Sequence, residues 1–195
     1  MAGKSGGIRQ ANQGLFQGSA PLLKRLVVAA MCPRDTTGWL RAGSVLIRCA
    51  IGRSGISRSK KEGDGATPAG RFRLLGGYFR LDRGARPRST PPLRVTNRAM
   101  GWCDDPRSSS YNRAIDTRAP VRQEAMWRAD ELYDVVFVID YNIHPRKKGA
   151  GSAIFFHLAR PGLVPTEGCV AISLTDMRRL IPRLSRRAVI DIRRT

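Results

Sequence analysis

The sequence predicts a single domain of the α+β class that is built mainly from β-strands. Its 195 residues suit one domain with a short tail. Most apolar residues fall in short runs rich in β-branched and aromatic side chains, separated by turns that contain Gly or Pro. This pattern is typical of strands. Only one segment has the spacing of an amphipathic helix, so we expect a fold with little helix.

The N-terminal half is predicted to contain a tail, three strands and a long loop. Residues 1–20 are rich in Gly and poor in large apolar side chains, which favours a disordered tail before a domain at 21–195. Three strand-like runs follow the tail. A loop rich in Gly and basic residues lies between the second run and the third. The runs are Leu22–Met31, Trp39–Ile51 and Arg71–Arg80, and the loop is Gly52–Gly70.

The C-terminal half begins with a long irregular stretch, Asp82–Ala125, which is dense in Arg, Pro, Ser and Asp. It is longer than the usual loop of a compact domain, which suggests a functional or lid-like role. A short strand is expected within it, around Leu93–Val95. Four further strands are predicted after it, at Tyr133–Tyr141, Ser152–Leu158, Cys169–Ile172 and Ala188–Ile192.

The one predicted helix spans Thr175–Leu184. Its apolar residues recur at the spacing of one helix face. Ser173 and Asp176 resemble a capping box with Asp in place of Glu. Pro182 lies inside the run and should end or kink the helix early.

The charge of the chain is unusual, because 35 Lys and Arg against 15 Asp and Glu give a net charge of +20. Such an excess attracts polyanions, although a solvated basic surface without a specific partner is the simpler interpretation. The basic residues are spread along the chain, and no helix-turn-helix, zinc-finger or RNA-binding motif is present. We therefore expect no specific nucleic-acid partner.

The four cysteines do not predict a metal site or a disulfide framework. Cys32, Cys49, Cys103 and Cys169 form no CxxC pair, and no His lies near them at metal-ligand spacing. Two disulfides could pair in three ways, and the sequence does not choose among them. Cys32 and Cys49 lie in apolar runs, where buried thiols are expected.

Neither a membrane span nor a clear signal peptide is predicted. No uninterrupted apolar stretch approaches the ~20 residues that a transmembrane helix requires. The run Leu26–Met31 is shorter than the ~7–15 apolar residues of a signal peptide.

The segment Gly151–Ser173, GSAIFFHLARPGLVPTEGCVAIS, contains the best candidates for chemistry. His157 ends one apolar strand and Cys169 opens the next, with a loop between them that can bring the two together. A thiol with a pKa of ~8.5 needs a base such as imidazole to become a nucleophile. Backbone N–H groups at Gly168, Cys169 and Val170 could stabilise an oxyanion. The alternative is that both side chains are ordinary core residues.

This segment resembles the catalytic motif of the L,D-transpeptidase (YkuD-like) family. That family has a His, a loop, Ser or Thr, usually His, and then Gly-Cys and a hydrophobic residue, which here are His157 and the run Thr166–Val170. A second resemblance, in the expected order, lies at Lys60–Phe72, KKEGDGATPAGRF. Glu167 replaces the usual His, and Ala171 stands where many members have Arg.

The resemblance implies a β-sandwich-like domain with a few short helices and no cofactor. It further implies that Cys169 attacks a peptidoglycan stem tetrapeptide after meso-diaminopimelate, with release of D-Ala, and that His157 is its base. A second stem amine would then resolve the thioester into a 3–3 or 1–3 cross-link. Such a role in cell-wall biogenesis and cell shape places the protein in the periplasm or cell envelope, with the cytoplasm as an alternative. Carbapenem-type β-lactams are the implied inhibitors.

Several other residues are candidates for the site. Thr166, Gly168 and Val170 would shape it, and substrate contacts are assigned to His144, Ser152, Arg71 and Tyr111. His144 and Ser152 could equally be turn residues. Glu167 would oppose thiolate formation unless it points away or pairs with an Arg.

Three other functions remain open at this stage. Water in place of the second amine would make the protein an L,D-carboxypeptidase. A non-catalytic module that binds the wall is a second alternative, and a basic nucleic-acid-binding protein is a third. The oligomeric state is not predicted.

Overall fold

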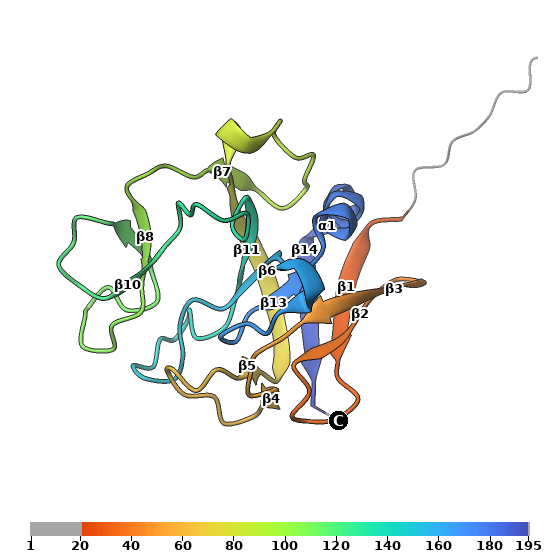
Figure 1. The fold of residues 1–195 in the computed structure, drawn as a ribbon, viewed down its shortest axis with the longest axis horizontal. Helices are drawn as coiled ribbons and strands as arrows, with labels where there is room; N and C mark the ends of the chain where they lie inside the picture. The colour runs from red at the N-terminus through yellow and green to blue at the C-terminus, as the bar shows by residue number, and fades with distance from the viewer. Residues whose placement is uncertain (1–20, 195) are drawn as a thin grey trace, which may run out of the picture.

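The structure, a computed structural model, describes residues 21–194 (Figure 1). The tail predicted at 1–20 therefore lies outside the described residues. Nine strands form the main sheet: β1 (Leu23–Ala29), β2 (Thr37–Ala42), β3 (Val45–Ala50), β6 (Gly70–Phe79), β7 (Leu93–Val95), β11 (Val135–Ile139), β12 (Phe155–Leu158), β13 (Val170–Ile172) and β14 (Leu184–Arg193).

The main sheet closes on itself. Its strand order is β11-β12-β13-β3-β2-β1-β14-β6-β7, and β11 also pairs with β6. Eight strands thus form a ring, and β7 extends it as an edge strand on β6. The prediction of a mainly β fold is confirmed. The pairing describes one closed, barrel-like sheet and does not by itself establish the two-layer sandwich that the resemblance implied.

Two smaller sheets and four short helices complete the fold. One small sheet has the order β10-β8-β9, and β4 pairs with β5 in the other. These strands are β4 (Ile56–Ser57), β5 (Thr67–Pro68), β8 (Met100–Cys103), β9 (Ala114–Asp116) and β10 (Gln123–Ala125). The helices are the 3-10 turns η1 (Leu81–Arg83), η2 (Pro161–Leu163) and η3 (Ile181–Arg183) and the helix α1 (Leu174–Leu180).

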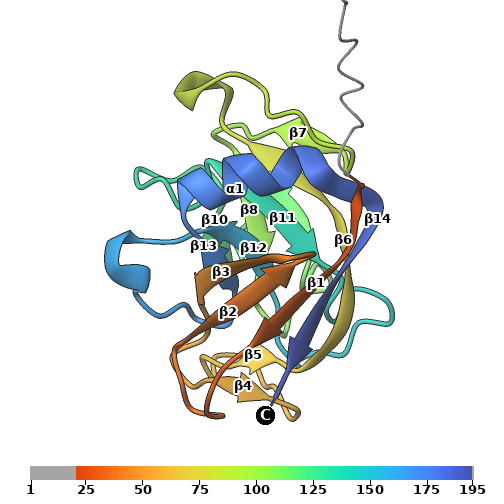
Figure 2. The same ribbon diagram turned by 90° about the vertical axis from the view of Figure 1, so that its right-hand side faces the viewer.

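The main core fills the inside of the ring. Alternate residues of each strand point inward, as the two-residue period of a strand requires. Leu26 and Val28 of β1, Leu40 of β2 and Ile190 of β14 are all fully buried there. The helix α1 adds Met177 and Leu180 to this core, and it lies above β2 and β3 in the view of Figure 2.

The helix begins and ends as its sequence predicts. The Ser173 hydroxyl accepts a hydrogen bond of 3.0 Å from the Asp176 N–H and donates one of 2.6 Å to the Asp176 carboxylate. Pro182 falls in the 3-10 turn η3, so the α-helix stops at Leu180. The run Trp39–Ile51 is a hairpin rather than one strand, because Gly43 turns the chain with a φ of +64°.

A second core lies on the outer face of β11 and β12. Residues 100–133 cover this face, and Trp102 packs edge-on against Phe155 with ring centroids 5.2 Å apart. This cluster also contains Met126, Tyr133 and Cys169. The long irregular stretch is therefore a cover with its own small sheet, seen at the left of Figure 1.

All four thiols are free. Cys49 is buried as expected, but Cys32 is exposed, because its N–H donates to Asp35 in a turn beyond the end of β1. Within residues 21–194, none of the helices has the length and apolarity that crossing a membrane requires.

Candidate active site

A cleft of about 500 Å³ opens beside β12 and β13. Both His157 and Cys169 line it, together with charged side chains from the loop after β4, from residues 104–128 and from the loop before β13. Four of these are basic and four are acidic. They are Lys60, Arg122, Arg128 and Arg160, and Glu62, Asp104, Glu124 and Glu167.

The pairing of β12 with β13 brings the candidate base and nucleophile together. The two strands are parallel, with Phe156 opposite Val170 and His157 opposite Ala171. Cys169 directly precedes Val170, so it lies beside Phe155. Side chains two residues apart point to the same face of a sheet. His157 and Cys169 are therefore diagonal neighbours on the outer face of the ring, where both line the cleft.

The Cys169 thiol is held between two backbone groups. The Phe155 N–H donates to Sγ at 3.3 Å, and Sγ donates to the Ala153 carbonyl oxygen at 3.3 Å. Burial raises the pKa of this thiol to about 12, against the opposing effect of the Phe155 N–H. The buried Cys169 side chain is thus a protonated thiol at neutral pH.

The surroundings of His157 leave one ring nitrogen available as a base. Nδ1 lies 2.8 Å from the Leu158 carbonyl oxygen. Since that oxygen only accepts, Nδ1 carries the proton and Nε2 keeps its lone pair. Burial lowers the pKa of His157 to about 4, against the opposing effect of this backbone bond. The Tyr133 ring packs edge-on against the imidazole, with centroids 5.2 Å apart.

The turn before the nucleophile depends on Thr166 and Gly168. The Thr166 hydroxyl donates to the Cys169 carbonyl oxygen at 2.7 Å and accepts from the Gly168 N–H at 3.2 Å. The Gly168 N–H is therefore engaged within the turn. Val170 points into the core and is fully buried.

Replacing Gly168 with alanine is expected to destabilise the protein by at least about 2 kcal/mol, through backbone strain and overlap. Gly168 has a φ of +133°, and a Cβ there would lie 2.7 Å from the Ala66 carbonyl oxygen. Urea unfolding measures the loss. Gly162→Ala is the matched control in the same loop, because it has a φ of +76° and open space around it. Equal losses in both variants would contradict the overlap.

The Glu167 carboxylate is paired with the Arg53 guanidinium. The Arg53 Nε lies 2.8 and 3.0 Å from its two carboxylate oxygens, and both side chains are more than half exposed. Thiolate formation requires Glu167 either to point away from the thiol or to pair with an Arg, and the Arg53 ion pair meets the second condition. Arg53 lies shortly after β3, and its N–H donates to the Thr166 carbonyl oxygen, so this pair also fastens the loop before Cys169.

Glu62 organises the other wall of the cleft. Its carboxylate accepts a bond of 2.7 Å from the Ser152 hydroxyl and another from the Tyr111 hydroxyl. The Gly151 N–H donates to the same Tyr111 oxygen at 3.0 Å. Ser152 lines the cleft. Tyr111 does not line it, because its ring is buried beneath Glu62 and Gly151.

Two other predicted contacts lie away from the cleft. His144 is exposed next to a cis peptide bond with Pro145, and Arg71 is exposed on β6, opposite Asp191 of β14. Sequence reasoning missed Lys60, which lines the cleft with a side chain only 3% exposed. Its ammonium lies 2.6 Å from Asp64 Oδ1. In the sequence, this pair lies in the KKEGDG segment, which contributes to the family resemblance but does not mark Lys60 as a site residue.

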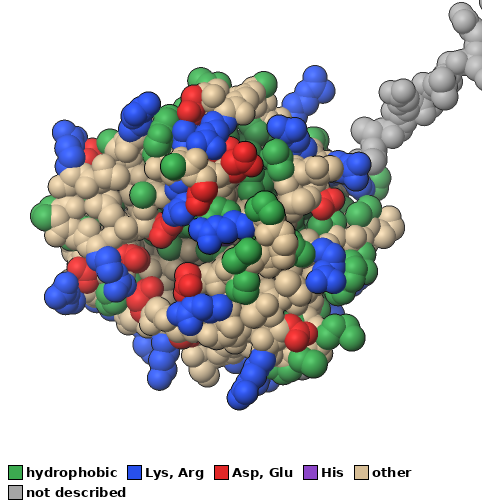
Figure 3. All heavy atoms as spheres, viewed as in Figure 1, with side chains coloured by type: hydrophobic (Ala, Val, Ile, Leu, Met, Phe, Trp, Pro, Cys, Tyr) green, Lys and Arg blue, Asp and Glu red, His purple; other side chains and the backbone are tan. Residues whose placement is uncertain are grey.

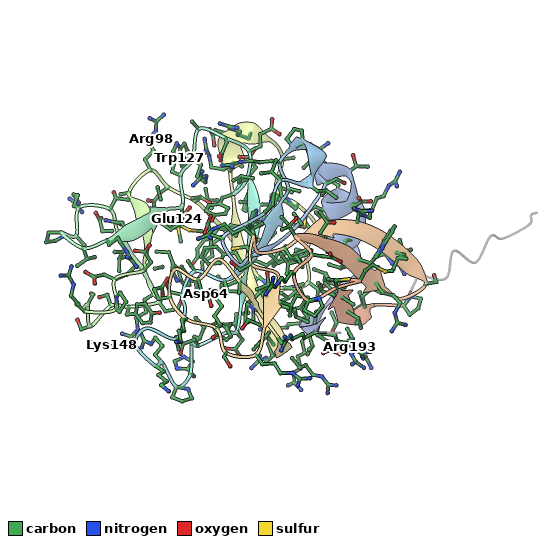
Figure 4. All side chains as sticks on the ribbon, turned by 60° about the horizontal axis from the view of Figure 1, so that its bottom comes forward. Asp64, Arg98, Glu124, Trp127, Lys148 and Arg193 are labelled. Carbon is green, nitrogen blue, oxygen red and sulfur yellow. The ribbon has the colours of Figure 1, made fainter. Side chains whose placement is uncertain are left out.

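Residues 100–133, which cover β11 and β12, contribute a second charged cluster to the cleft that the sequence did not predict. Arg128 bonds Glu124 at 2.8 Å and Asp130 at 2.7 Å, and its guanidinium lies 5.3 Å from the Tyr133 ring centroid. Tyr133 in turn packs against His157. Figure 4 shows Glu124 between Asp64 and Trp127. Arg128 and its carboxylate partners are thereby connected to His157 through the Tyr133 ring.

Alkylation of Cys169 should depend steeply on pH. Because burial raises the thiol pKa to about 12, the thiolate fraction should rise about tenfold per pH unit between pH 7 and 9. Iodoacetamide labelling followed by peptide mass spectrometry measures the rate, with the exposed Cys32 as the internal reference. A Cys169 rate that stayed constant across this range would show a preformed thiolate and contradict the expectation.

Comparison with known proteins identifies the family. Residues 32–192 match the family model described as the L,D-transpeptidase catalytic domain. Searches of the curated proteins and of the solved structures found no match. Within residues 21–194, no group of three or more His, Cys, Asp and Glu side chains is placed to hold a metal ion. The family match spans most of the chain, including both segments that carried the resemblance, and this protein therefore belongs to the L,D-transpeptidase catalytic domain family.

Proposed function

We propose that this protein is a peptidoglycan L,D-transpeptidase in which Cys169 is the nucleophile and His157 its base. The observation that carries the proposal is the register of β12 on β13, which places the two side chains on one face, in the cleft. The Nδ1 bond to Leu158 leaves Nε2 free to take a proton. Membership of the family supports the same chemistry.

The first half-reaction forms a thioester. Sγ attacks the carbonyl carbon of meso-diaminopimelate in a stem tetrapeptide, and the Sγ proton passes to His157 Nε2. The Cys169 N–H stabilises the oxyanion. The carbon–nitrogen bond to D-Ala then breaks, and the imidazolium returns the proton to the departing amine. Because the resting thiol and imidazole are both neutral, proton transfer accompanies the attack.

The second half-reaction forms the cross-link. The amine of a second stem attacks the thioester carbon, loses a proton to His157, and expels the thiolate, which takes the proton back. The cleft suits such substrates because its walls carry four basic and four acidic side chains. Diaminopimelate carries both an amine and a carboxylate beyond the reacting bond, and paired charges of both signs can bind such a group.

The location and inhibitors follow from this substrate. Stem peptides lie in the cell envelope, so we place the protein in the periplasm or at the wall, with a role in cell-wall biogenesis and cell shape. Carbapenem-type β-lactams present a strained acyl group to the same thiol, and they should acylate Cys169.

Intact-protein mass spectrometry with a disaccharide-tetrapeptide tests the proposal. We expect the mass of the protein to increase by that of the disaccharide-tripeptide less one water, while free D-Ala appears in solution. Product analysis then separates the two family reactions. Cross-linked dimers indicate a transpeptidase, and free tripeptide alone indicates an L,D-carboxypeptidase. A protein that forms no adduct with this substrate or with a carbapenem would be a non-catalytic wall-binding module.

A further inference from the structure

The outer face of β3, β2, β1, β14 and β6 carries a field of arginines on the side of the ring away from the cleft. In the ring of eight strands, β1 stands four places from β12, and β14 stands four places from β13. Figure 2 looks onto these strands. We define the arginine face by Arg25, Arg41, Arg48, Arg71, Arg73, Arg187 and Arg193, all of which are exposed.

The strand register places these arginines in adjacent rows. Arg41 is opposite Val27, which is opposite Asp191, and Asp191 is opposite Arg71. In the next row Arg25 is opposite Val189, and Val189 is opposite Arg73. Neighbouring strands lie about 4.8 Å apart. The charges are therefore spread in two dimensions over the sheet rather than along a single line.

Few acidic groups offset this charge. Asp191 is the acidic residue at the centre of the face, and it is paired with Arg25 and with Arg193, the latter at 3.1 Å. Within residues 21–194, no carboxylate forms an ion pair with Arg41, Arg71, Arg73 or Arg187. The cleft, by contrast, contains equal numbers of acidic and basic side chains. The arginine face thus carries a net positive charge that the cleft lacks.

Exposed apolar side chains lie among these arginines. Leu46 is 55% exposed opposite Arg41, and Trp39 is 37% exposed next to Arg48, whose guanidinium lies 5.1 Å from its ring centroid. Val45 extends this apolar group at the tip of the β2–β3 hairpin, with 44% exposure. In Figure 3, basic and hydrophobic side chains lie together at the right-hand margin, where Figure 1 places β1–β3.

We propose that the arginine face binds the surface of an anionic phospholipid bilayer. Guanidinium groups bind phosphate oxygens, and a two-dimensional field of them matches a layer of headgroups. Exposed Leu and Val side chains gain free energy by entering the acyl boundary, and Trp is favoured at the interface between headgroups and acyl chains. A nucleic-acid backbone would give the exposed aliphatic tip no comparable burial. The cleft then opens away from the membrane.

Vesicle co-sedimentation of the full chain tests this inference. The probe is a phosphatidylcholine vesicle with about a third phosphatidylglycerol, compared with pure phosphatidylcholine. Each basic residue near an anionic surface contributes on the order of fivefold to partitioning. The variant R41E/R73E/R187E should therefore bind on the order of 100-fold more weakly, while its thermal unfolding confirms that it folds.

The matched control is R98E/R113E/K148E, which changes the net charge equally at exposed positions off the arginine face. Figure 4 shows Arg98 and Lys148 far from Arg193. This control should keep most of the vesicle affinity. Anionic vesicles should also shift the Trp emission of the wild type to shorter wavelength, and Trp39→Phe should remove that shift.

Three outcomes would overturn the inference. The first is equal loss of affinity in both triple variants, which would mean generic charge attraction. The second is a vesicle affinity of the R41E/R73E/R187E variant that equals that of the wild type. The third is tighter binding of duplex DNA than of vesicles through the same three arginines, which would assign the face to nucleic acid. None of these outcomes depends on the proposed transpeptidase activity.

Discussion

Replacing Cys169 with serine is expected to abolish the acyl-enzyme and to lower turnover by on the order of 10⁴-fold or more. A hydroxyl at this position can keep the bonds to the Phe155 N–H and the Ala153 carbonyl oxygen, so the fold should survive. It is a far weaker nucleophile than a thiol when its only activator is a neutral imidazole. Intact mass spectrometry with the disaccharide-tetrapeptide and an assay of released D-Ala measure the two losses.

Cys32→Ser is the control for this variant. Its thiol is exposed and lies outside the cleft, so turnover should equal that of the wild type. Release of D-Ala by the Cys169→Ser variant at the wild-type rate would remove Cys169 from the mechanism. An adduct that peptide mapping of the Cys169→Ser variant places at a position other than 169 would point to attack by that other residue.

Replacing His157 with phenylalanine should reduce turnover by about 10²- to 10⁴-fold, the usual contribution of a positioned general base. Phenylalanine keeps an aromatic ring against Tyr133, which packs edge-on against the imidazole. Steady-state release of D-Ala measures the loss. His144→Phe is the matched control, because His144 is the only other histidine of the chain and is exposed. Equal activity of the two variants would contradict the assignment of the base.

The stability of the His157→Phe variant should depend less on acid pH than that of the wild type. Burial lowers the pKa of His157 from 6.5 to about 4. Between these values the unfolded chain binds a proton that the folded protein does not. Stability is therefore intact above pH 6.5 and falls as pH decreases towards 4, by about 3 kcal/mol from this residue.

Urea unfolding of the wild type and the His157→Phe variant at both ends of this pH range tests the linkage. The variant should lack this part of the acid dependence, whereas His144→Phe should retain it. Identical slopes of stability against pH in all three proteins would show that His157 does not titrate as its burial requires.

Much of this architecture could be predicted from local sequence. Short runs of β-branched and aromatic residues predicted the strands near Leu26 and Phe137, and Ser173 and Pro182 set the limits of α1. The pairing of His157 with Cys169 also followed from order and spacing, because a short loop joins two adjacent strands. The structure contains these strands and this helix, and it pairs β12 with β13, because each of these features depends on local propensity or on a direct chain connection.

Other features depend on contacts between distant segments and could not be predicted in this way. The ring closes where β11 meets β6, and no local pattern specifies that register. Tyr111 carries an aromatic ring in a polar loop, as a residue of a binding groove would, but Glu62 draws it into the interior. Lys60 resembles a surface lysine in sequence, and its burial becomes tolerable only because Asp64 folds back onto it.

The position of β14 in the ring has a consequence for biosynthesis. This strand, the last of the main sheet in chain order, inserts between β1 and β6, which are made much earlier. The ring cannot close until residue 193 has left the ribosome. Until then β1 and β6 lack the strand that joins them, so closure of the barrel is a late event in the synthesis of the protein.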